Sequence, residues 1–232
     1  MKGNKDQGTG SRGRAGRLNA VGVSLYWVAL LFTGLQALAS CGGTLVPLSA
    51  QAAPLYVSVD VPLNGTGTFY SPEMNLERLD VNALSTAKAT VDLAAFSLTD
   101  QAIADELKAL AARGVKVRIY LDRGELQSEC RGDISCARIP LKELIGLPGV
   151  DIRVKYSKIL MHLKSYEVDN FLLRDGSANF SIQGESKQDN SAVFSQDGNA
   201  LAGFRTKFEA MWERKDNLTV AQAVGATAEK AK

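Results

Sequence analysis

The sequence predicts an α/β domain, because short apolar strands alternate with amphipathic helices along the chain. Residues 90–98 and 115–121 are apolar runs typical of buried strands. Between them, Ile103, Leu107 and Leu110 recur at the spacing of one helix face. A strand, a helix and a strand in this order indicate a parallel βαβ unit. We therefore expect one domain built on a mixed, largely parallel central sheet.

The other elements follow from the same patterns. Thr99 has the residue type of a helix N-cap, and Gly114 is expected to end the helix that starts there. The apolar stripe of the last helix, which includes Leu201 and Phe208, is assigned to core packing. The remaining predicted elements are a strand at 68–72, a helix at 74–88, a short helix near 141–145, strands at 150–154, 162–169, 171–173 and 191–195, and the last helix at 200–215.

The front of the chain has the pattern of an export signal. Nineteen basic, glycine-rich residues precede a nearly uncharged segment at 20–39. The Leu-Ala-Ser-Cys-Gly sequence around Cys41 is similar to a bacterial lipobox, which predicts lipidation of that cysteine. Cleavage among the small residues 49–53 and a retained membrane helix are the alternatives. We expect an exported protein of a bacterium, either periplasmic or anchored to the membrane as a lipoprotein.

Composition divides the chain into four parts. Residues 1–40 are the expected signal peptide, and residues 41–67 form a linker rich in proline, glycine and small residues. Residues 68–215 have the length of a single domain, and residues 216–232 are expected to be a flexible tail. The formal net charge of +2 is too small to mark a strongly basic protein.

The chain has one histidine, His162, and it heads the most informative pattern in the sequence. Lys164 follows two residues later, Asp169 follows seven residues later, and Ser177 and Asn179 stand in a Gly-Ser-Ala-Asn-Phe-Ser segment. Alternate residues of a strand share a face, so His162 and Lys164 are expected to project toward one ligand. Asp169 has the opposite parity and is expected to shape the site from behind. A nucleophile and a cation would thus share one pocket.

This pattern, HxKxxxxD followed by GSxNxS, resembles the signature of the phospholipase D superfamily. The resemblance is to the short single-motif bacterial endonucleases and their cardiolipin hydrolase relatives. It implies an α-β-α sandwich with one such motif per chain, and a metal-independent phosphodiesterase without a cofactor. His162, Lys164 and Asp169 are then the catalytic motif, and a phosphohistidine forms on His162. By the same resemblance, Lys164, Ser177 and Asn179 bind the substrate phosphate.

A single histidine per chain predicts a homodimer. Two histidines on opposite sides of phosphorus divide the work of nucleophile and acid, but this chain supplies only one. Two-fold symmetry would bring two His162 motifs into one active site, as the resemblance also implies. An acid beyond the GSxNxS segment is expected to orient the imidazole, and Asp189 is favoured over Glu185 for this part.

Cysteine and histidine usage argues against a metal site. One histidine and three cysteines do not make a convincing zinc site, and the sequence shows no clustered carboxylates for magnesium. We therefore expect activity that survives chelation. In an oxidising compartment Cys130 and Cys136 are expected to close a small surface loop by a disulfide, with two free thiols as the alternative.

The motif predicts a phosphodiester but not what is attached to it. Nucleic acid is the first choice as substrate and partner, because basic residues surround the motif in sequence and would attract a polyanion. These residues are Lys155, Lys158, Lys164, Arg174 and Lys187. Phospholipid is the alternative, since an anchored enzyme would meet head groups constantly, although the sequence shows no clear apolar rim beside the site. An inactive phosphate-binding protein is a third class.

Overall fold

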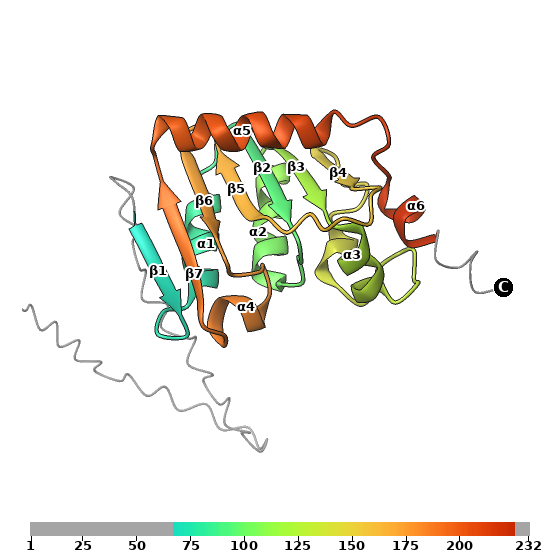
Figure 1. The fold of residues 1–232 in the computed structure, drawn as a ribbon, viewed down its shortest axis with the longest axis horizontal. Coiled ribbons are helices and arrows are strands. Elements are labelled where there is room, and N and C mark those ends of the chain that lie inside the picture. Colours follow the sequence, from blue (N-terminus) through green and yellow to red (C-terminus); the bar gives the residue numbers. More distant parts are fainter. Residues whose placement is uncertain (1–66, 226–232) are drawn as a thin grey trace, which may run out of the picture. The chain divides into compact units, whose positions relative to one another are not determined.

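Seven strands form one sheet in the computed structural model, which describes residues 67–225 (Figure 1). Their order across the sheet is β1-β7-β6-β5-β2-β3-β4. The strands are β1 (Gly67–Ser71), β2 (Thr90–Ala95), β3 (Lys116–Leu121), β4 (Val150–Val154), β5 (Lys164–Val168), β6 (Leu172–Gly176) and β7 (Asn190–Ser195). The helices are α1 (Leu76–Ser85), α2 (Gln101–Ala112), α3 (Arg123–Cys130), the 3₁₀ helix η1 (Pro140–Glu143), α4 (Ile182–Ser186), α5 (Gly198–Trp212) and α6 (Val220–Gly225).

Parallel pairing is confined to β2, β3 and β4. The pairs β1–β7, β7–β6, β6–β5 and β5–β2 are antiparallel. The expected α/β class and mixed sheet are confirmed, but the expectation of a largely parallel sheet is wrong. One reason is the tight turn between β5 and β6, where Asp169 and Asn170 have φ angles of 52° and 54°. Two successive residues of positive φ reverse the chain and pair the flanking strands antiparallel.

Helices cover both faces of the sheet (Figure 1). On one face, α1 and α2 pack on alternate residues of the central strands, such as Leu93 and Ile119. On the other face, Phe208 and Trp212 of α5 pack on Ala94 and Tyr120. The α-β-α sandwich is therefore confirmed, as is the core role of the apolar stripe on α5.

The start of α2 differs by one residue from the prediction. Asp100 is the N-cap, and its Oδ1 accepts hydrogen bonds from the backbone N–H groups of Ala102 and Ile103. Thr99 is instead tied by its own N–H to the carbonyl of Phe180. A carboxylate that accepts two N–H groups is a good helix cap.

The packed domain extends beyond the expected boundary at Lys215. Leu218 pairs with Val154, and Val220, Ala223 and Val224 are buried. A flexible tail is therefore the wrong description of the residues up to Gly225, because α6 supplies apolar side chains to the core. The predicted signal peptide and the lipidation of Cys41 lie outside the described residues, as does the linker except for its last residue. Within 67–225, the helices are too short or too polar to cross a membrane.

Candidate active site

The site lies at the edge of the sheet where β2 and β3 end and β5 begins. His162 is exposed and stands two residues before β5. The N–H of Phe96 donates to the carbonyl of Leu163 at 2.8 Å, which continues the β2–β5 pairing beyond Ala95. The carboxyl ends of parallel strands are where α/β proteins bind their ligands.

The ring of Phe96 holds the two main motif residues together. It meets the imidazole of His162 edge to face, with ring centroids 4.6 Å apart. The Nζ atom of Lys164 lies 4.8 Å from the centre of the same ring and donates to the carbonyl of His162 at 2.8 Å. The structure thus places His162 and Lys164 side by side. The sequence reasoning missed Phe96, which stood only as part of an apolar run.

The ammonium group of Lys164 is largely removed from water. Its residue is 5% exposed, and burial lowers the pKa of this lysine, while the negative charge of Glu125 opposes that shift. The face of the Phe96 ring offers partial compensation for the lost hydration. A cation with so few fixed partners is suited to bind phosphate oxygens.

Asp122 fixes the backbone just before His162. It is the N-cap of α3, and its Oδ1 accepts from the N–H of Glu125 at 2.9 Å. Its Oδ2 accepts from the N–H of Met161 at 2.8 Å. One buried carboxylate therefore joins the end of β3 to the segment that carries His162. The available signal was an aspartate directly after an apolar strand, which the sequence reasoning did not use.

Ser177 and Asn179 lie at the same edge, after β6, but differ in what they can offer. The hydroxyl of Ser177 donates to Oδ1 of Asn190 and accepts from the N–H of Ser191, each at 2.9 Å. The Oδ1 atom of Asn179 is buried without a hydrogen-bond partner among the described residues. Asn179 therefore keeps capacity for a ligand, whereas the hydroxyl of Ser177 mainly joins β6 to β7.

Gly176 is required where this segment leaves β6. Its φ is +153°, and a Cβ atom there would lie 2.2 Å from the carbonyl oxygen of Ser191. Only glycine combines that backbone conformation with so close an approach. The glycine of the motif is thus explained by the packing of β6 on β7.

Asp169 lies away from the other motif residues. It stands in the turn after β5, and the strand alone puts roughly 13 Å between its ends. Its carboxylate accepts the backbone N–H groups of Lys88, Ala89 and Thr90 at 2.7 to 2.9 Å. The structure does not bring Asp169 to His162, so the expectation that it shapes the site from behind does not fit. It ties the β5–β6 turn to the start of β2.

Neither expected orienting acid meets the imidazole. Within residues 67–225, His162 makes no hydrogen bond through its ring to Asp189 or to Glu185. Asp189 is exposed and lines a shallow pocket with Ser177. Glu185 is fully buried in a cluster of acids. The geometry of the described residues therefore does not support the expectation that Asp189 or Glu185 orients the imidazole of His162.

A different acid lies close to the site on α3. The pairing register, continued by the Phe96 hydrogen bond, places Ser97 opposite His162. The hydroxyl of Ser97 donates to Oε1 of Glu129 at 2.5 Å. Burial raises the pKa of Glu129 to about 7, against the lowering effect of the Ser97 hydrogen bond. A carboxyl group with such a pKa can hold or release a proton at neutral pH. No sequence pattern singles out Glu129, which stands in a polar stretch.

Cys130 and Cys136 are joined by a disulfide, with Cα atoms 4.6 Å apart. Both residues are fully buried and belong to the main core. The expectation of a bridge confined to the surface is wrong in that respect, because α6 packs against α3. Nε2 of Gln127 donates to the carbonyl of Ala223 at 2.6 Å across that contact.

The segment before His162 combines basic and exposed apolar side chains. Tyr156, Ile159 and Leu160 are 53%, 76% and 58% exposed. The expectation that no apolar rim borders the site is therefore wrong. Arg174 must be removed from the basic residues around the motif, because it is fully buried and paired with Asp80.

The chain is similar to known proteins in both sequence and fold. The sequence model of a family described as "Cardiolipin synthase, PLD-like domain" matches residues 81–212. The mitochondrial cardiolipin hydrolase of Chlamydomonas reinhardtii is 27% identical over 130 residues. These residues are 56% of this chain and 54% of that protein, so the chain spans about half the length of this relative.

Two solved structures share the fold. One is Nuc from Salmonella typhimurium, a phospholipase D family member, with 25% sequence identity and a TM-score of 0.56 over 66% of this chain and 97% of that one. The other is NucT from Helicobacter pylori, with 22% identity and a TM-score of 0.54 over 64% of this chain and 95% of that one. Almost all of each of these shorter chains is thus represented in the described domain.

Proposed function

The chain belongs to the PLD-like domain family, a branch of the phospholipase D superfamily, and we propose that it is a metal-independent phosphodiesterase whose nucleophile is His162. The observation that supports this most directly is the joint contact of Phe96 with the imidazole and with the Lys164 ammonium. A nucleophile and a fixed cation side by side are what attack on a phosphodiester requires.

The proposed reaction has two steps. A ring nitrogen of His162 forms a bond to phosphorus as the bond from phosphorus to the leaving oxygen breaks. Water then attacks the phosphohistidine, releases a phosphate monoester and restores the imidazole. Lys164 binds the nonbridging oxygens through its ammonium group, and the Nδ2–H groups of Asn179 donate to them, whereas the unpartnered Oδ1 of that amide can only accept from a donor.

We propose that the working site is formed by two copies of the chain. The leaving oxygen needs a proton, and a second His162 across a two-fold axis would supply it. The exposure of His162 supports this arrangement, as do the exposed side chains of Ile159 and Leu160 beside it. An interface there would bury apolar surface that is otherwise in contact with water.

Nucleic acid is the substrate that we propose first. A groove of about 240 Å³ near the site is lined by Lys155, Tyr156 and Arg214, among others. Basic groups that follow a phosphate backbone, with an aromatic ring for a base to stack on, are typical of single-strand binding. The resemblance of the motif to single-motif bacterial endonucleases points the same way.

Phospholipid is the second candidate, and a separate observation favours it. Ile159 and Leu160 form an exposed apolar rim directly before His162, as an enzyme that works at a lipid surface would need. The relative from Chlamydomonas reinhardtii is named as a cardiolipin hydrolase. If the rim is the dimer interface, it is not free to meet lipid, so the two uses of this surface compete.

We further propose that the chain is exported, with a mature protein that begins at Cys41 or near residue 53. The uncharged segment at 20–39 and the lipobox-like sequence support this. Mass spectrometry of the membrane and soluble fractions would identify the mature end, and an intact residue 1 in both would contradict export.

The test is hydrolysis at 25 °C, in EDTA, of plasmid DNA and of cardiolipin vesicles, with a His162→Gln variant alongside. DNA cleavage that the variant loses supports the nuclease, and lipid cleavage alone would move the chain to the phospholipases. Mixing experiments test the dimer. If subunits exchange freely, an equal mixture of wild type and variant keeps about one quarter of the activity of a shared site, but about one half of independent sites.

A further inference from the structure

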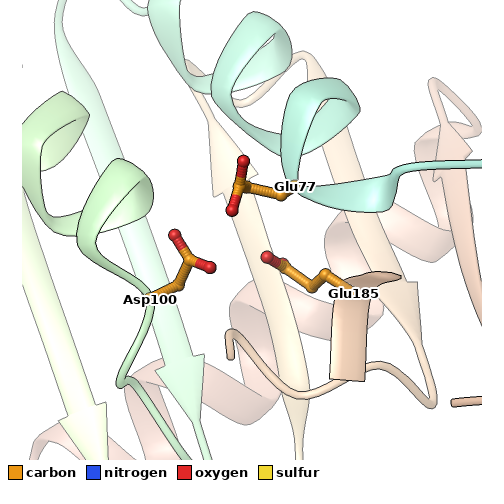
Figure 2. Close-up of side chains that lie close together, drawn as sticks. All are labelled: Glu77, Asp100 and Glu185. Carbon is orange, nitrogen blue, oxygen red and sulfur yellow. The ribbon is translucent and has the colours of Figure 1, made fainter. Parts of the chain in front are cut away.

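Three carboxylates from three helical segments converge beneath the sheet edge (Figure 2). Glu77 comes from the first turn of α1, Asp100 caps α2, and Glu185 lies on α4. One oxygen atom from each lies within 4.8 Å of the others. Asp100 and Glu185 are fully buried, whereas Glu77 is partly exposed and offers a way in from solvent.

Two of these acids have oxygen atoms to which no N–H or hydroxyl group of the described residues donates. Oδ1 of Asp100 accepts the N–H groups that begin α2, but its Oδ2 has no partner among the described residues. Both carboxylate oxygens of Glu185 are buried without a hydrogen-bond donor there. Burial of such groups without compensation is costly. The three side chains point toward one another, so the unsatisfied oxygens face a common point (Figure 2).

The buried cation near the cluster is Arg174, and its hydrogen bonds go to other groups. Nε and Nη2 of Arg174 donate to the two carboxylate oxygens of Asp80 at 3.0 and 2.9 Å. Its Nη1 donates to the carbonyls of Lys164 and Ala178. Four of the five N–H groups of a guanidinium are thus in use. The hydrogen bonds of Arg174 go to Asp80 and the two carbonyls, so its charge, like that of Arg78 near Glu77, offsets only part of the charge of the three converging carboxylates.

We propose that Glu77, Asp100 and Glu185 bind one calcium ion. Carboxylate oxygens are the ligands of hard divalent cations. Three oxygen atoms that all lie within 4.8 Å of one another can share one cation. We choose Ca²⁺ because it accepts carboxylate ligands in flexible geometry, whereas Mg²⁺ demands near-ideal octahedral geometry and usually keeps several of its waters. This site differs from the expectation of no metal, which rested on the few histidines and cysteines and on the lack of clustered carboxylates. The difference arises because acids on different elements can converge in space without leaving a trace in the sequence.

This site goes beyond the proposed catalysis, since none of its residues contacts His162 in the described structure. A bound ion would act on the segments that hold the active-site residues in place. Glu185 follows the segment of Asn179, and Asp100 follows the strand extension of Phe96 and Ser97. A calcium ion would therefore fasten two segments of the active edge to α1.

The test is direct binding of calcium to the full chain. After treatment with EDTA and exchange into chelator-free buffer at pH 7.5, CaCl₂ is titrated in by calorimetry and thermal unfolding is followed. We expect one ion per chain and a rise in Tm of about 5–10 °C at a hundredfold excess over Kd. No binding by the stripped wild type would overturn the proposal, and stabilisation by Mg²⁺ but not by Ca²⁺ would overturn the choice of ion.

Two isosteric variants assign the binding to the cluster. Glu185→Gln and Asp100→Asn should each abolish the rise in Tm, since asparagine can still cap α2. Glu213→Gln, an exposed acid at the end of α5, is the matched control and should keep the rise. A Glu185→Gln variant that retains calcium binding would place the ion elsewhere and contradict the proposal. If that variant does not fold, the wild-type titration still decides. Neither readout depends on phosphodiesterase activity.

Discussion

The two ends of β5 use their polar groups in opposite ways. Where the strand begins, the ring of His162 has only an aromatic contact among the described residues, and Oδ1 of Asn179 is buried without a partner. Where it ends, Asp169 accepts three backbone N–H groups, and Oε1 of Glu167 pairs with Arg205 at 3.1 Å, while Oε2 of Glu167 is buried without a partner among the described residues. One end presents an exposed imidazole beside a buried ammonium, and the other uses most of its polar groups to hold the fold together.

The size of a pocket does not identify the reactive end. A pocket of about 560 Å³ lies at the amino ends of β2 and β3, the end away from His162, and is lined in part by Asp92, Arg118 and Glu209. These three charges pair with one another, with Arg118 at 2.6 Å from each acid. The active edge is therefore marked by an exposed imidazole beside a buried ammonium, rather than by hollow space.

The largest expected effect is that of His162→Gln, which tests the end of the sheet where β5 begins. Loss of the nucleophile should lower kcat/KM by about 10⁴-fold or more. Stability should change by less than about 0.5 kcal/mol, because the residue is exposed. The measurements are hydrolysis of bis(p-nitrophenyl) phosphate and thermal unfolding. A variant that keeps a tenth of the activity would show that another group attacks phosphorus.

Lys164→Met should have the next largest effect. Removal of one positive group from a developing charge typically lowers the rate by about 10²- to 10³-fold. Lys164→Arg should restore little, because a planar guanidinium does not replace a compact ammonium between the Phe96 ring and the His162 carbonyl. Lys187→Met, which changes an exposed lysine, is the control for charge alone. Equal losses in Lys164→Met and Lys187→Met would argue for general attraction of the substrate instead.

Asp169→Ala tests the end of the sheet where β5 ends. It should lower the free energy of unfolding but not the rate of hydrolysis per folded molecule. Loss of its three N–H contacts should cost about 2–3 kcal/mol. Burial alone would raise the pKa of Asp169, but the N–H groups outweigh it and hold the pKa below 3.8. Its contribution is therefore present above about pH 4 and is lost as the pH falls further. Urea unfolding at pH 7 and pH 3 measures both effects. Activity lost at unchanged stability would return Asp169 to the catalytic residues.

Local patterns predicted most elements of the fold and a hairpin-like arrangement of the strands between residues 162 and 195. The antiparallel pairs β5–β6 and β6–β7 confirm that arrangement, but the patterns did not predict that most of the sheet is antiparallel. The strand at 150–154 and the apolar face of α5 follow from periodicity, which depends on neighbours along the chain. The antiparallel half of the sheet depends on a turn with two residues of positive φ, and nothing in an Asp-Asn-Phe sequence requires that conformation. Val220, Ala223 and Val224 have the spacing of one helix face, so the sequence contains a pattern that predicts α6.

The motif predicted which residues to examine, but only part of how they are arranged. His162 and Lys164 are adjacent because alternation along a chain is a local property. Phe96, Asp122 and Glu129 come from other elements, and only the three-dimensional structure brings them to His162. Asp169 shows the converse, because it belongs to the sequence motif but lies away from His162 and Lys164.

Glu129→Gln should have the smallest effect. It tests whether the buried charge of Glu129 lowers the free energy of unfolding. The unfolded chain releases this proton near pH 4.5, whereas burial in the folded protein raises the pKa to about 7. The folded state binds more protons in between, so the stability of the wild type should fall as the pH rises through this window. Glutamine can still accept from Ser97 and carries no charge. The variant should therefore match the wild type near pH 4.5 and exceed it by about 1–3 kcal/mol at pH 8. If urea unfolding shows no such gain, Glu129 is ionised without penalty, and the two ends of the sheet differ in their contacts but not in the cost of their charges.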